Sequence, residues 1–204
     1  MEKALSEHYY SNNPSVTSKP KSWSFTLRNH KFMFTSDSGV FSKSEVDFGS
    51  RLLIEAFERP NVDGPVLDVG CGYGPIGLSI AKDFTDLSIE MIDVNERAVN
   101  LAKENARINE VHNVSIHTSD LFSNVETGEF AAILTNPPIR AGKKVVHEIF
   151  EESYKRLVPG GDLWIVIQKK QGAPSAIDKL ESLFNEVNVI LKKKGYYIIK
   201  SKKG

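Results

Sequence analysis

The chain of 204 residues lacks several features that mark whole classes of protein. Its 26 basic and 26 acidic residues cancel, so no net field draws the protein as a whole onto nucleic acid. A single cysteine, Cys71, excludes an internal disulfide and is typical of a reducing compartment. No apolar run approaches the roughly 18 residues of a membrane span, and the N-terminus lacks the apolar centre of a signal peptide. We therefore expect a soluble, cytoplasmic protein.

No metal centre is predicted, because the five histidines are scattered along the chain and one cysteine adds no cluster of ligands. Hydrophobic residues make up 40% of the chain and charged residues 25%, which are ordinary values for a globular protein. The length suits one sizeable α/β domain with a short appendage, and no feature predicts an oligomeric state.

From Pro65 onward, short apolar runs alternate with amphipathic segments, a pattern typical of a parallel, doubly wound sheet. Strands are predicted at 65–69, 87–92, 113–118, 130–135, 161–168, 186–191 and 195–200. Helices are predicted at 75–83, 95–109, 143–157 and 174–184. Pro159-Gly160-Gly161 should close the third of these helices. Only the link 192–195 separates the last two strands, so the final strand should run antiparallel in a mostly parallel, seven-stranded sheet.

The N-terminal region departs from this alternation. Residues 1–22 are polar and predict an irregular arm. Apolar and polar residues then alternate from Trp23 to Phe34, as in a two-stranded hairpin. A lone hairpin is marginal in water, so this one should pack on the main domain, either as a plain extension or as a lid over a site.

A helix should begin at Ser44, with Asp47 three residues on completing an approximate capping box. An apolar stripe from Leu52 to Phe57 supports this helix. We therefore divide the chain into an N-terminal arm and hairpin, residues 1–43, and a main domain, residues 44–204.

An asparagine and two prolines follow the apolar run 130–135. Pro137 and Pro138 have no N–H to give a sheet, so they end the strand and hold Asn136 extended at its carboxyl edge. Open α/β sheets bind ligands at that edge. The amide oxygen of Asn136 and the carbonyls of both prolines can accept the hydrogens of a planar amino group, because no helix is expected to engage these carbonyls in hydrogen bonds. The alternative is a loop that merely ends a strand, since Asn-Pro and Pro-Pro are common turn signals.

Upstream, a glycine-rich run joins a predicted strand to the start of a helix. Glycines allow positive φ and let a ligand approach the backbone closely. Gly72, Gly74 and Gly77 match a dinucleotide-binding fingerprint, so a nicotinamide or flavin dinucleotide site is one interpretation. Asp68 argues against it, because a carboxylate beside the loop would repel a pyrophosphate but suits a cationic ligand with an amino group.

Two more acidic residues follow the next two predicted strands. Asp93 ends the second strand, where a carboxylate can hold both hydroxyls of a ribose. Asp120 follows the third strand, where it could accept a hydrogen bond from an adenine amino group. With Asp68 and Asn136, these residues outline one groove along the carboxyl edge of the sheet.

Together these motifs resemble the class I S-adenosylmethionine-dependent methyltransferases, whose Asn-Pro-Pro branch methylates amino nitrogens. The resemblance rests on 68–74, Asp93, Asp120 and 136–139. Three further segments resemble the small methyltransferase family, whose best-known members are ribosomal small-subunit RNA guanine-N2 methyltransferases: 8–11, 39–42 and 47–53. The resemblance covers nearly the whole chain and implies a Rossmann-like methyltransferase fold with S-adenosylmethionine as cofactor.

The resemblance implies roles position by position. Cofactor binding is implied for Asp68, Gly70, Cys71, Gly72, Gly74, Asp93, Asp120, Leu121 and Asn136. The glycines would wrap the methionine part and Asp68 would lie near its amino group, while Asp93 would hold the ribose and Asp120 the adenine. Catalysis is implied for Asn136, Pro137, Pro138 and Ile139. The fourth position of this motif is often aromatic, and isoleucine there weakens stacking on a flat acceptor.

These roles imply methylation of an exocyclic amine, first of all guanine N2 in small-subunit ribosomal RNA, with that RNA or the small subunit as partner. Two acceptors on the amine hydrogens would aim its lone pair at the methyl carbon, so the reaction needs mainly positioning and no metal. Adenine N6 and a protein glutamine amide are alternative acceptors. A non-catalytic RNA-binding module and a nucleotide-dependent oxidoreductase are alternatives of other classes.

Local basic clusters are the remaining candidates for RNA contact. Two are interpreted as solvated faces: Lys192–Lys194 with Lys200, Lys202 and Lys203, and Lys19, Lys21, Arg28 and Lys31. Arg140, Lys143 and Lys144 lie beside the Asn-Pro-Pro motif and are better placed to meet a phosphate backbone.

Overall fold

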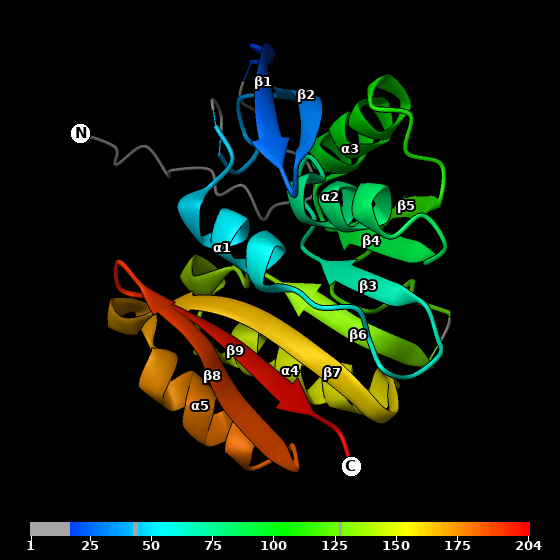
Figure 1. Ribbon diagram of the computed structural model, residues 1–204. Coiled ribbons are helices and arrows are strands. Elements are labelled where there is room, and N and C mark those ends of the chain that lie inside the picture. The colour runs from blue at the N-terminus through cyan, green and yellow to red at the C-terminus, as the bar shows by residue number, and fades with distance from the viewer. Residues whose placement is uncertain (1–16, 43–44, 127) are drawn as a thin grey trace, which may run out of the picture.

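A computed structural model describes residues 17–42, 45–126 and 128–204, and its centre is a seven-stranded sheet in the order β5-β4-β3-β6-β7-β9-β8 (Figure 1). The strands are Val66–Val69 (β3), Ile89–Asp93 (β4), Val114–Thr118 (β5), Phe130–Thr135 (β6), Leu157–Gln168 (β7), Glu186–Lys193 (β8) and Tyr196–Lys202 (β9). Strands β3 to β7 are mutually parallel, and β9 runs antiparallel between β7 and β8. The predicted mostly parallel sheet with an antiparallel last strand is confirmed.

Helices cover both faces of this sheet (Figure 1). They are Phe48–Ala56 (α1), Pro75–Asp83 (α2), Glu96–Ile108 (α3), Lys143–Arg156 (α4) and Ala173–Glu181 (α5), with short 3-10 turns at Ile139–Ala141 (η1) and Lys169–Gln171 (η2). Trp164 and Val166 of β7 join the core with α1, α2 and α3, while Leu163 and Ile165 join the core with α4 and α5. This is the alternation that a strand buried on both faces produces. Of the helices described, none is long and apolar enough to cross a membrane.

The first helix begins later than predicted. Ser44 lies outside the described residues, and α1 begins at Phe48. Asp47 is its N-cap, with the carboxylate accepting the Ser50 N–H at 2.9 Å. A carboxylate at this position satisfies an amide that the helix leaves without a partner, so Asp47 caps the helix by itself.

The prediction that Pro159-Gly160-Gly161 closes a helix is wrong. Helix α4 ends at Arg156, and Leu157 is already extended as the first residue of β7. Gly160 N–H donates to Lys203 O at 2.8 Å, and Lys203 N–H donates to Gly161 O at 2.9 Å. Pairing with Lys203 therefore continues β7 through Pro159-Gly160-Gly161, although proline and glycine locally disfavour a strand.

The N-terminal hairpin is confirmed as Lys21–Leu27 (β1) and His30–Ser36 (β2). It packs on the main sheet's helices through the side chain of Asn105, which lies on α3. Asn105 Oδ1 accepts the Thr35 N–H at 2.8 Å, and its Nδ2 donates to Thr35 O at 2.9 Å. The side-chain amide thus pairs with β2 as a neighbouring strand would. Residues 1–16 of the predicted arm lie outside the described residues. The division at residue 43 and the lid remain predictions.

Candidate functional site

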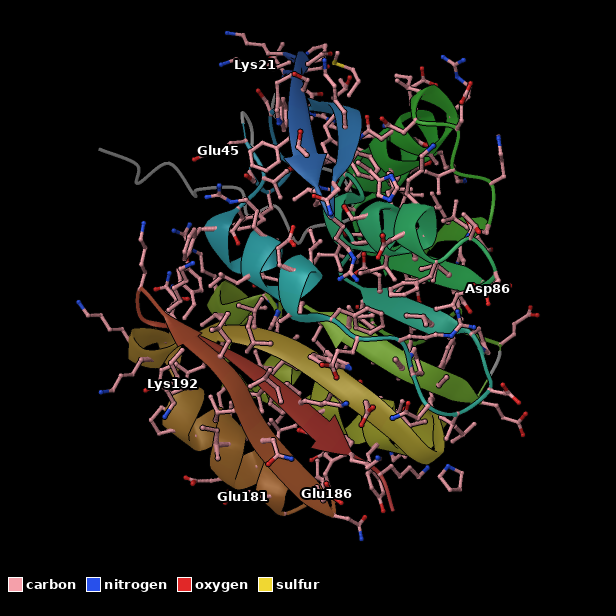
Figure 2. The ribbon with its side chains drawn as sticks, viewed as in Figure 1. Lys21, Glu45, Asp86, Glu181, Glu186 and Lys192 are labelled. Atoms are coloured by element: carbon pink, nitrogen blue, oxygen red, sulfur yellow. The ribbon has the colours of Figure 1, made fainter. Side chains whose placement is uncertain are left out.

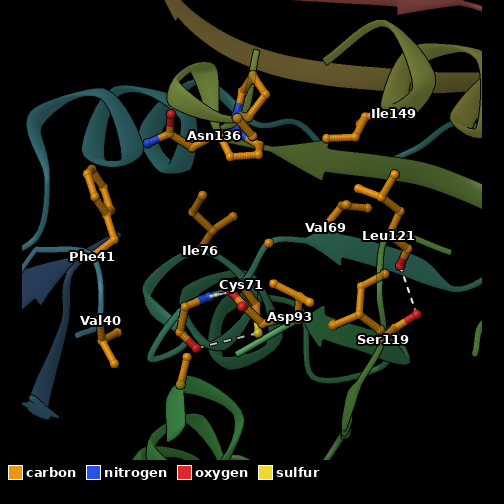
Figure 3. Close-up of a pocket in the computed structure, with 18 of the residues that line it drawn as sticks. Val40, Phe41, Val69, Cys71, Ile76, Asp93, Ser119, Leu121, Asn136 and Ile149 are labelled. Atoms are coloured by element: carbon orange, nitrogen blue, oxygen red, sulfur yellow. Dashed lines mark hydrogen bonds between the residues drawn. The ribbon is translucent and has the colours of Figure 1, made fainter. Parts of the chain in front are cut away.

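The carboxyl ends of β3, β4, β5 and β6 meet around a cavity of about 380 Å³ (Figure 3). Small-molecule sites commonly measure about 300–1,000 Å³, so the cavity is large enough for an organic ligand. The predicted site residues that line it are Gly70, Cys71, Gly72, Asp93, Asp120, Leu121, Asn136, Pro137 and Pro138. Three predicted residues are not among its lining: Asp68, Gly74 and Ile139.

The glycine loop after β3 meets two different demands. Gly70 and Gly72 have φ values of 75° and 58°, and a Cβ on either would enter open space. Because both line the cavity, a side chain there would occupy room that a ligand can use. Gly74 instead caps α2 with φ of 98°, and a Cβ on it would lie 2.8 Å from Leu78 Cδ1. A glycine at position 74 is therefore needed for the packing of Leu78 in α2.

Asp68 lies completely buried beneath this loop. Its Oδ2 accepts the Gly77 N–H at 2.8 Å, which ties β3 to the first turn of α2, while its Oδ1 has no partner among the described residues. Burial raises the pKa of the Asp68 carboxyl to about 7; the Gly77 hydrogen bond opposes this shift, and the charge of Asp93 adds to it. The contact of Asp68 with a ligand amino group remains a prediction.

Asp93, at the end of β4, is held by backbone groups of two loops. Oδ2 accepts the Gly72 N–H at 2.8 Å, and Oδ1 accepts the Asn95 N–H at 2.9 Å. Burial raises its pKa, although both hydrogen bonds favour the charged form. The carboxylate is therefore fixed in orientation at the cavity wall, and each oxygen keeps lone-pair capacity for a ligand hydroxyl.

The turn after β5 presents Asp120 and Leu121 to the cavity. Ser119 Oγ donates to Leu121 O at 2.8 Å (Figure 3) and accepts the Asn124 N–H at 3.1 Å. Leu121 adopts a φ of 48°, and these bonds hold that left-handed turn. Asp120 is exposed, so its carboxylate is placed to accept a hydrogen bond at the solvent side of a bound molecule.

Asn136 is clamped from a distant part of the chain. Its Nδ2 donates to Asp47 Oδ2 at 3.2 Å and to Ser50 Oγ at 3.0 Å. An ionised carboxylate can only accept, so the NH₂ end of the amide must face Asp47. The NH₂ group is then engaged by two neighbouring acceptors, while Oδ1 accepts no hydrogen bond from the described residues. This leaves Oδ1 as an oriented acceptor on a residue that lines the cavity.

The two prolines differ from the sequence-based expectation. Pro137 O accepts the Ile139 N–H at 2.8 Å, and Pro138 O accepts the Ala141 N–H at 2.8 Å. The prediction that no helix engages these carbonyls is wrong for Pro138 O, which bonds within η1. Pro137 O is engaged by a tight turn just before η1, and each oxygen keeps a second lone pair. Ile139 packs against the core between the sheet and α4.

Several cavity residues lie outside the predicted site. Val40 and Phe41 reach it from the segment after the hairpin, and Ser50 reaches it from α1. The apolar walls also include Ile76, Ile92, Ala98, Val145 and Ile149. The segments 39–42 and 47–53 carried the family resemblance, but no sequence signal pairs Asp47 with Asn136 across 89 residues.

Cys71 adds no reactive thiolate to this arrangement. Burial raises the pKa of its thiol well above the usual value, and Sγ donates to Gly72 O at 3.6 Å. Over the residues that the structure describes, no group of three or more His, Cys, Asp or Glu side chains could hold a metal ion. Apolar walls with fixed carboxylates and one oriented amide suit an organic ligand and a planar amino group.

Comparison with known proteins identifies relatives along almost the whole chain. The family model described as the methyltransferase small domain matches residues 31–200. The uncharacterized protein YbxB of Bacillus subtilis (strain 168) is 70% identical over 200 residues, which covers 98% of this chain and 100% of that protein.

Two further relatives carry functional names. Ribosomal RNA small subunit methyltransferase C of Vibrio cholerae is 32% identical over 188 residues, covering 90% of this chain and 53% of that protein. The structure of T. thermophilus 16S rRNA N2 G1207 methyltransferase (RsmC), in complex with AdoMet and guanosine, aligns with a TM-score of 0.81 at 25% identity, covering 94% of this chain and 52% of that one. The chain thus spans about half the length of these two relatives.

Proposed function

This chain belongs to the methyltransferase small domain family, and on that premise we propose that it transfers a methyl group from S-adenosylmethionine to guanine N2 in small-subunit ribosomal RNA. The names of two relatives support small-subunit ribosomal RNA as the substrate, and the name of the one solved with AdoMet and guanosine supports guanine N2. A ribosomal RNA substrate also agrees with the cytoplasmic location that the single cysteine predicts.

S-adenosylmethionine is the expected cofactor, and the cavity residues fit it. Gly70 and Gly72 leave room for a ligand against the backbone, and the fixed Asp93 carboxylate suits the paired hydroxyls of a ribose. Asp120 would accept a hydrogen bond from the adenine amino group. When bound, the cofactor supplies an electrophilic methyl carbon on a sulfonium centre.

The observation that carries the proposal is the orientation of Asn136. Asp47 and Ser50 hold the NH₂ end of the amide, so Oδ1 is available to accept a hydrogen from an incoming amino group. A freely rotating amide would present its NH₂ group to the amine about as readily as its oxygen. The clamp removes that ambiguity before the acceptor arrives, which is the preorganisation that positioning catalysis needs.

An exocyclic amine is a poor nucleophile because its lone pair is delocalised into the ring. Acceptance of its hydrogens by Asn136 Oδ1, and by the remaining lone pair of Pro137 O, would favour a pyramidal nitrogen whose lone pair points at the methyl carbon. A base within a paired stem must first be flipped out of its stack, which costs a few kcal/mol.

The test combines cofactor binding with identification of the product. Calorimetric titration should give micromolar binding of S-adenosylmethionine and none of NADH. Naked 16S rRNA and small subunits, both from cells lacking this protein, are then incubated with tritiated cofactor and digested to nucleosides. Label in N2-methylguanosine supports the proposal. Label in N6-methyladenosine or in a protein glutamine instead assigns a different acceptor, and absent cofactor binding overturns the proposal.

A further inference from the structure

Three segments free of acidic residues follow the strands on the Asn136 side of the cavity. No Asp or Glu occurs within 136–147, 163–177 or 187–203. Seven exposed lysines at the strand ends of these segments are here called the lysine rim: Lys143, Lys144, Lys169, Lys170, Lys192, Lys193 and Lys194. In a chain with zero formal net charge, this is a concentrated positive field.

The sheet brings the three segments to one edge. Strands β6 and β7 are parallel, so the segment that leads to Lys143, the first residue of α4, and the turn η2 both follow carboxyl ends. Antiparallel pairing of Gln168 with Tyr196 places the β8–β9 turn beside η2, and Lys169 N–H donates to Gly195 O at 2.8 Å. Figure 2 shows Lys192 at this end of β8 and Glu186 at the far end.

The β8–β9 turn also contacts the helix that orients Asn136. Lys194 Nζ lies 5.1 Å from the ring centroid of Phe48, and the Phe48 and Tyr196 rings meet edge to face at 5.6 Å. Phe48 is the first residue of α1 and follows Asp47, the residue that holds the Asn136 amide. The lysine rim is therefore continuous with the acceptor side of the cavity.

The lysines of the rim differ from others in this half of the chain. Lys155 pairs with Glu152 at 2.7 Å, Lys179 with Glu151 at 2.5 Å, and Lys200 with Asp162 at 3.3 Å. Within the described ranges, no ion pair involves a lysine of the rim. Their charges remain available to an anionic partner.

The predicted C-terminal basic patch is in fact split by strand direction. Lys202 pairs in register with Asp162 near the start of β7, and Lys203 Nζ donates to Leu157 O at 2.7 Å. Both therefore lie at the edge opposite Lys192–Lys194. Only Lys192–Lys194 share an edge of the sheet with Asn136.

We propose that the lysine rim binds the phosphate backbone of the RNA that presents the acceptor base, an inference that rests on the proposed function. The four neighbouring strands β6, β7, β9 and β8 span about 14 Å, since adjacent strands lie ~4.8 Å apart. This distance is too wide for one phosphate and suits several consecutive ones. The loops after β4 and β5 carry Asp93, Glu96 and Asp120, which would repel a backbone lying there. The RNA is therefore expected across the β6–β7–β9 side.

The test compares two triple variants with the same loss of charge. One is Lys192→Gln/Lys193→Gln/Lys194→Gln, and the matched control is Lys21→Gln/Lys31→Gln/Lys103→Gln, three exposed lysines of β1, β2 and α3. Binding of a fluorescent 16S rRNA fragment is measured by anisotropy from 50 to 300 mM salt. The rim variant should bind on the order of 10- to 100-fold more weakly at 0.1 M salt, and its slope of log K against log salt should fall by about 2–3.

Methyl transfer gives the second measurement. The rim variant should show a raised KM for RNA with kcat and the Kd of S-adenosylmethionine unchanged, while the control triple behaves as wild type. Equal losses in both triples, or none in either, overturn the inference even if wild type methylates RNA. Wild type that binds RNA through the rim but transfers no methyl group to it overturns the proposed function alone. Preference for phosphatidylglycerol vesicles over RNA overturns the inference.

Discussion

The two halves of the sheet's carboxyl edge are held together in different ways. In the cofactor half, formed by the loops after β3, β4 and β5, side chains bond backbone groups of their own loop or of the neighbouring one. Asp93 bonds both Asn95 and Gly72, and Ser119 bonds Leu121. In the acceptor half, formed by the loops after β6 and β7 and the β8–β9 turn, the contacts are distant, as between Asn136 and Asp47.

This difference separates two tasks. The cofactor half consists of turns stabilised by bonds within a loop and between neighbouring loops, as Asp93 shows with Asn95 and Gly72. Its acidic residues suit a ligand with hydroxyl and amino groups. The acceptor half depends on the docking of α1 against the sheet, and its lysines suit a polyanion. Variants in one half should therefore leave the binding properties of the other intact.

Replacement of Asn136 should give the largest effect. Asn136→Ala removes the oriented acceptor, so methyl transfer should fall by about 10³-fold, roughly 4 kcal/mol of transition-state stabilisation. The Kd of S-adenosylmethionine, measured by calorimetry, should stay within about twofold of wild type. Unchanged turnover would remove Asn136 from the mechanism, and a lost cofactor site would show that the two halves are not separable.

The buried Asp68 should make the stability of the cofactor half depend on pH. Its folded pKa of about 7 lies above the unfolded value near 3.9, so its contribution is fully present below about pH 4 and is lost as the pH rises through 7. Relative to Asp68→Asn, the unfolding free energy of wild type should fall by on the order of 3 kcal/mol between pH 4 and pH 8. Urea titrations of both proteins measure this difference, and a flat difference would contradict the raised pKa.

Removal of the Asp93 carboxylate should affect the cofactor alone. Asp93→Ala loses the hydrogen bonds that align Gly72 and those expected to the ribose, so the Kd of S-adenosylmethionine should rise about 100-fold. RNA binding by anisotropy should stay unchanged. Glu96→Ala is the matched control, since Glu96 is an exposed acid at the start of α3. An equal loss of RNA binding in Asp93→Ala would break the division between the halves.

Removal of the Asp47 carboxylate, which orients Asn136, should have the smallest effect of the four substitutions. Asp47→Ala should lower kcat by about tenfold with the cofactor Kd unchanged, and should cost about 1 kcal/mol of stability through the lost cap. Asp47→Asn should restore both, because a single oxygen, Oδ2, accepts from Ser50 and from Asn136. A turnover in Asp47→Asn as low as in Asp47→Ala would show that charge, rather than orientation, is what Asp47 supplies.

Much of the fold could be predicted because its signals are local. Alternation of apolar runs and helical stripes predicted every strand of the main sheet. The helix predicted at 95–109 is present as α3, capped by Asn95, which accepts the Arg97 N–H. The errors fell where distant pairing overrides local preference. Gly160 and Gly161 read as a helix end, but pairing with Lys203 draws them into β7.

The candidate site divides along the same line. Gly70, Gly72, Asp93 and Asp120 could be predicted to share a groove, since parallel strands bring their carboxyl ends together. Asp68 and Gly74 do not line it. The hydrogen bonds that the proline carbonyls accept could not be predicted, because no local signal indicated that the chain enters the turn η1 directly after Pro138. Ile139 is partly buried against the core, and its role at the acceptor stays a prediction.

By itself the sequence determined the alternation of strands and helices, the glycine turn, the order of acids along the chain and the rigid exit from β6. All of these depend on φ, ψ preferences and hydrogen bonds within a few residues. Only the tertiary structure decided that Asp47 and Ser50 orient Asn136, and that Lys192–Lys194 share its edge while Lys202 and Lys203 do not. Such pairings depend on strand direction and helix docking, which bring together residues that no local pattern connects.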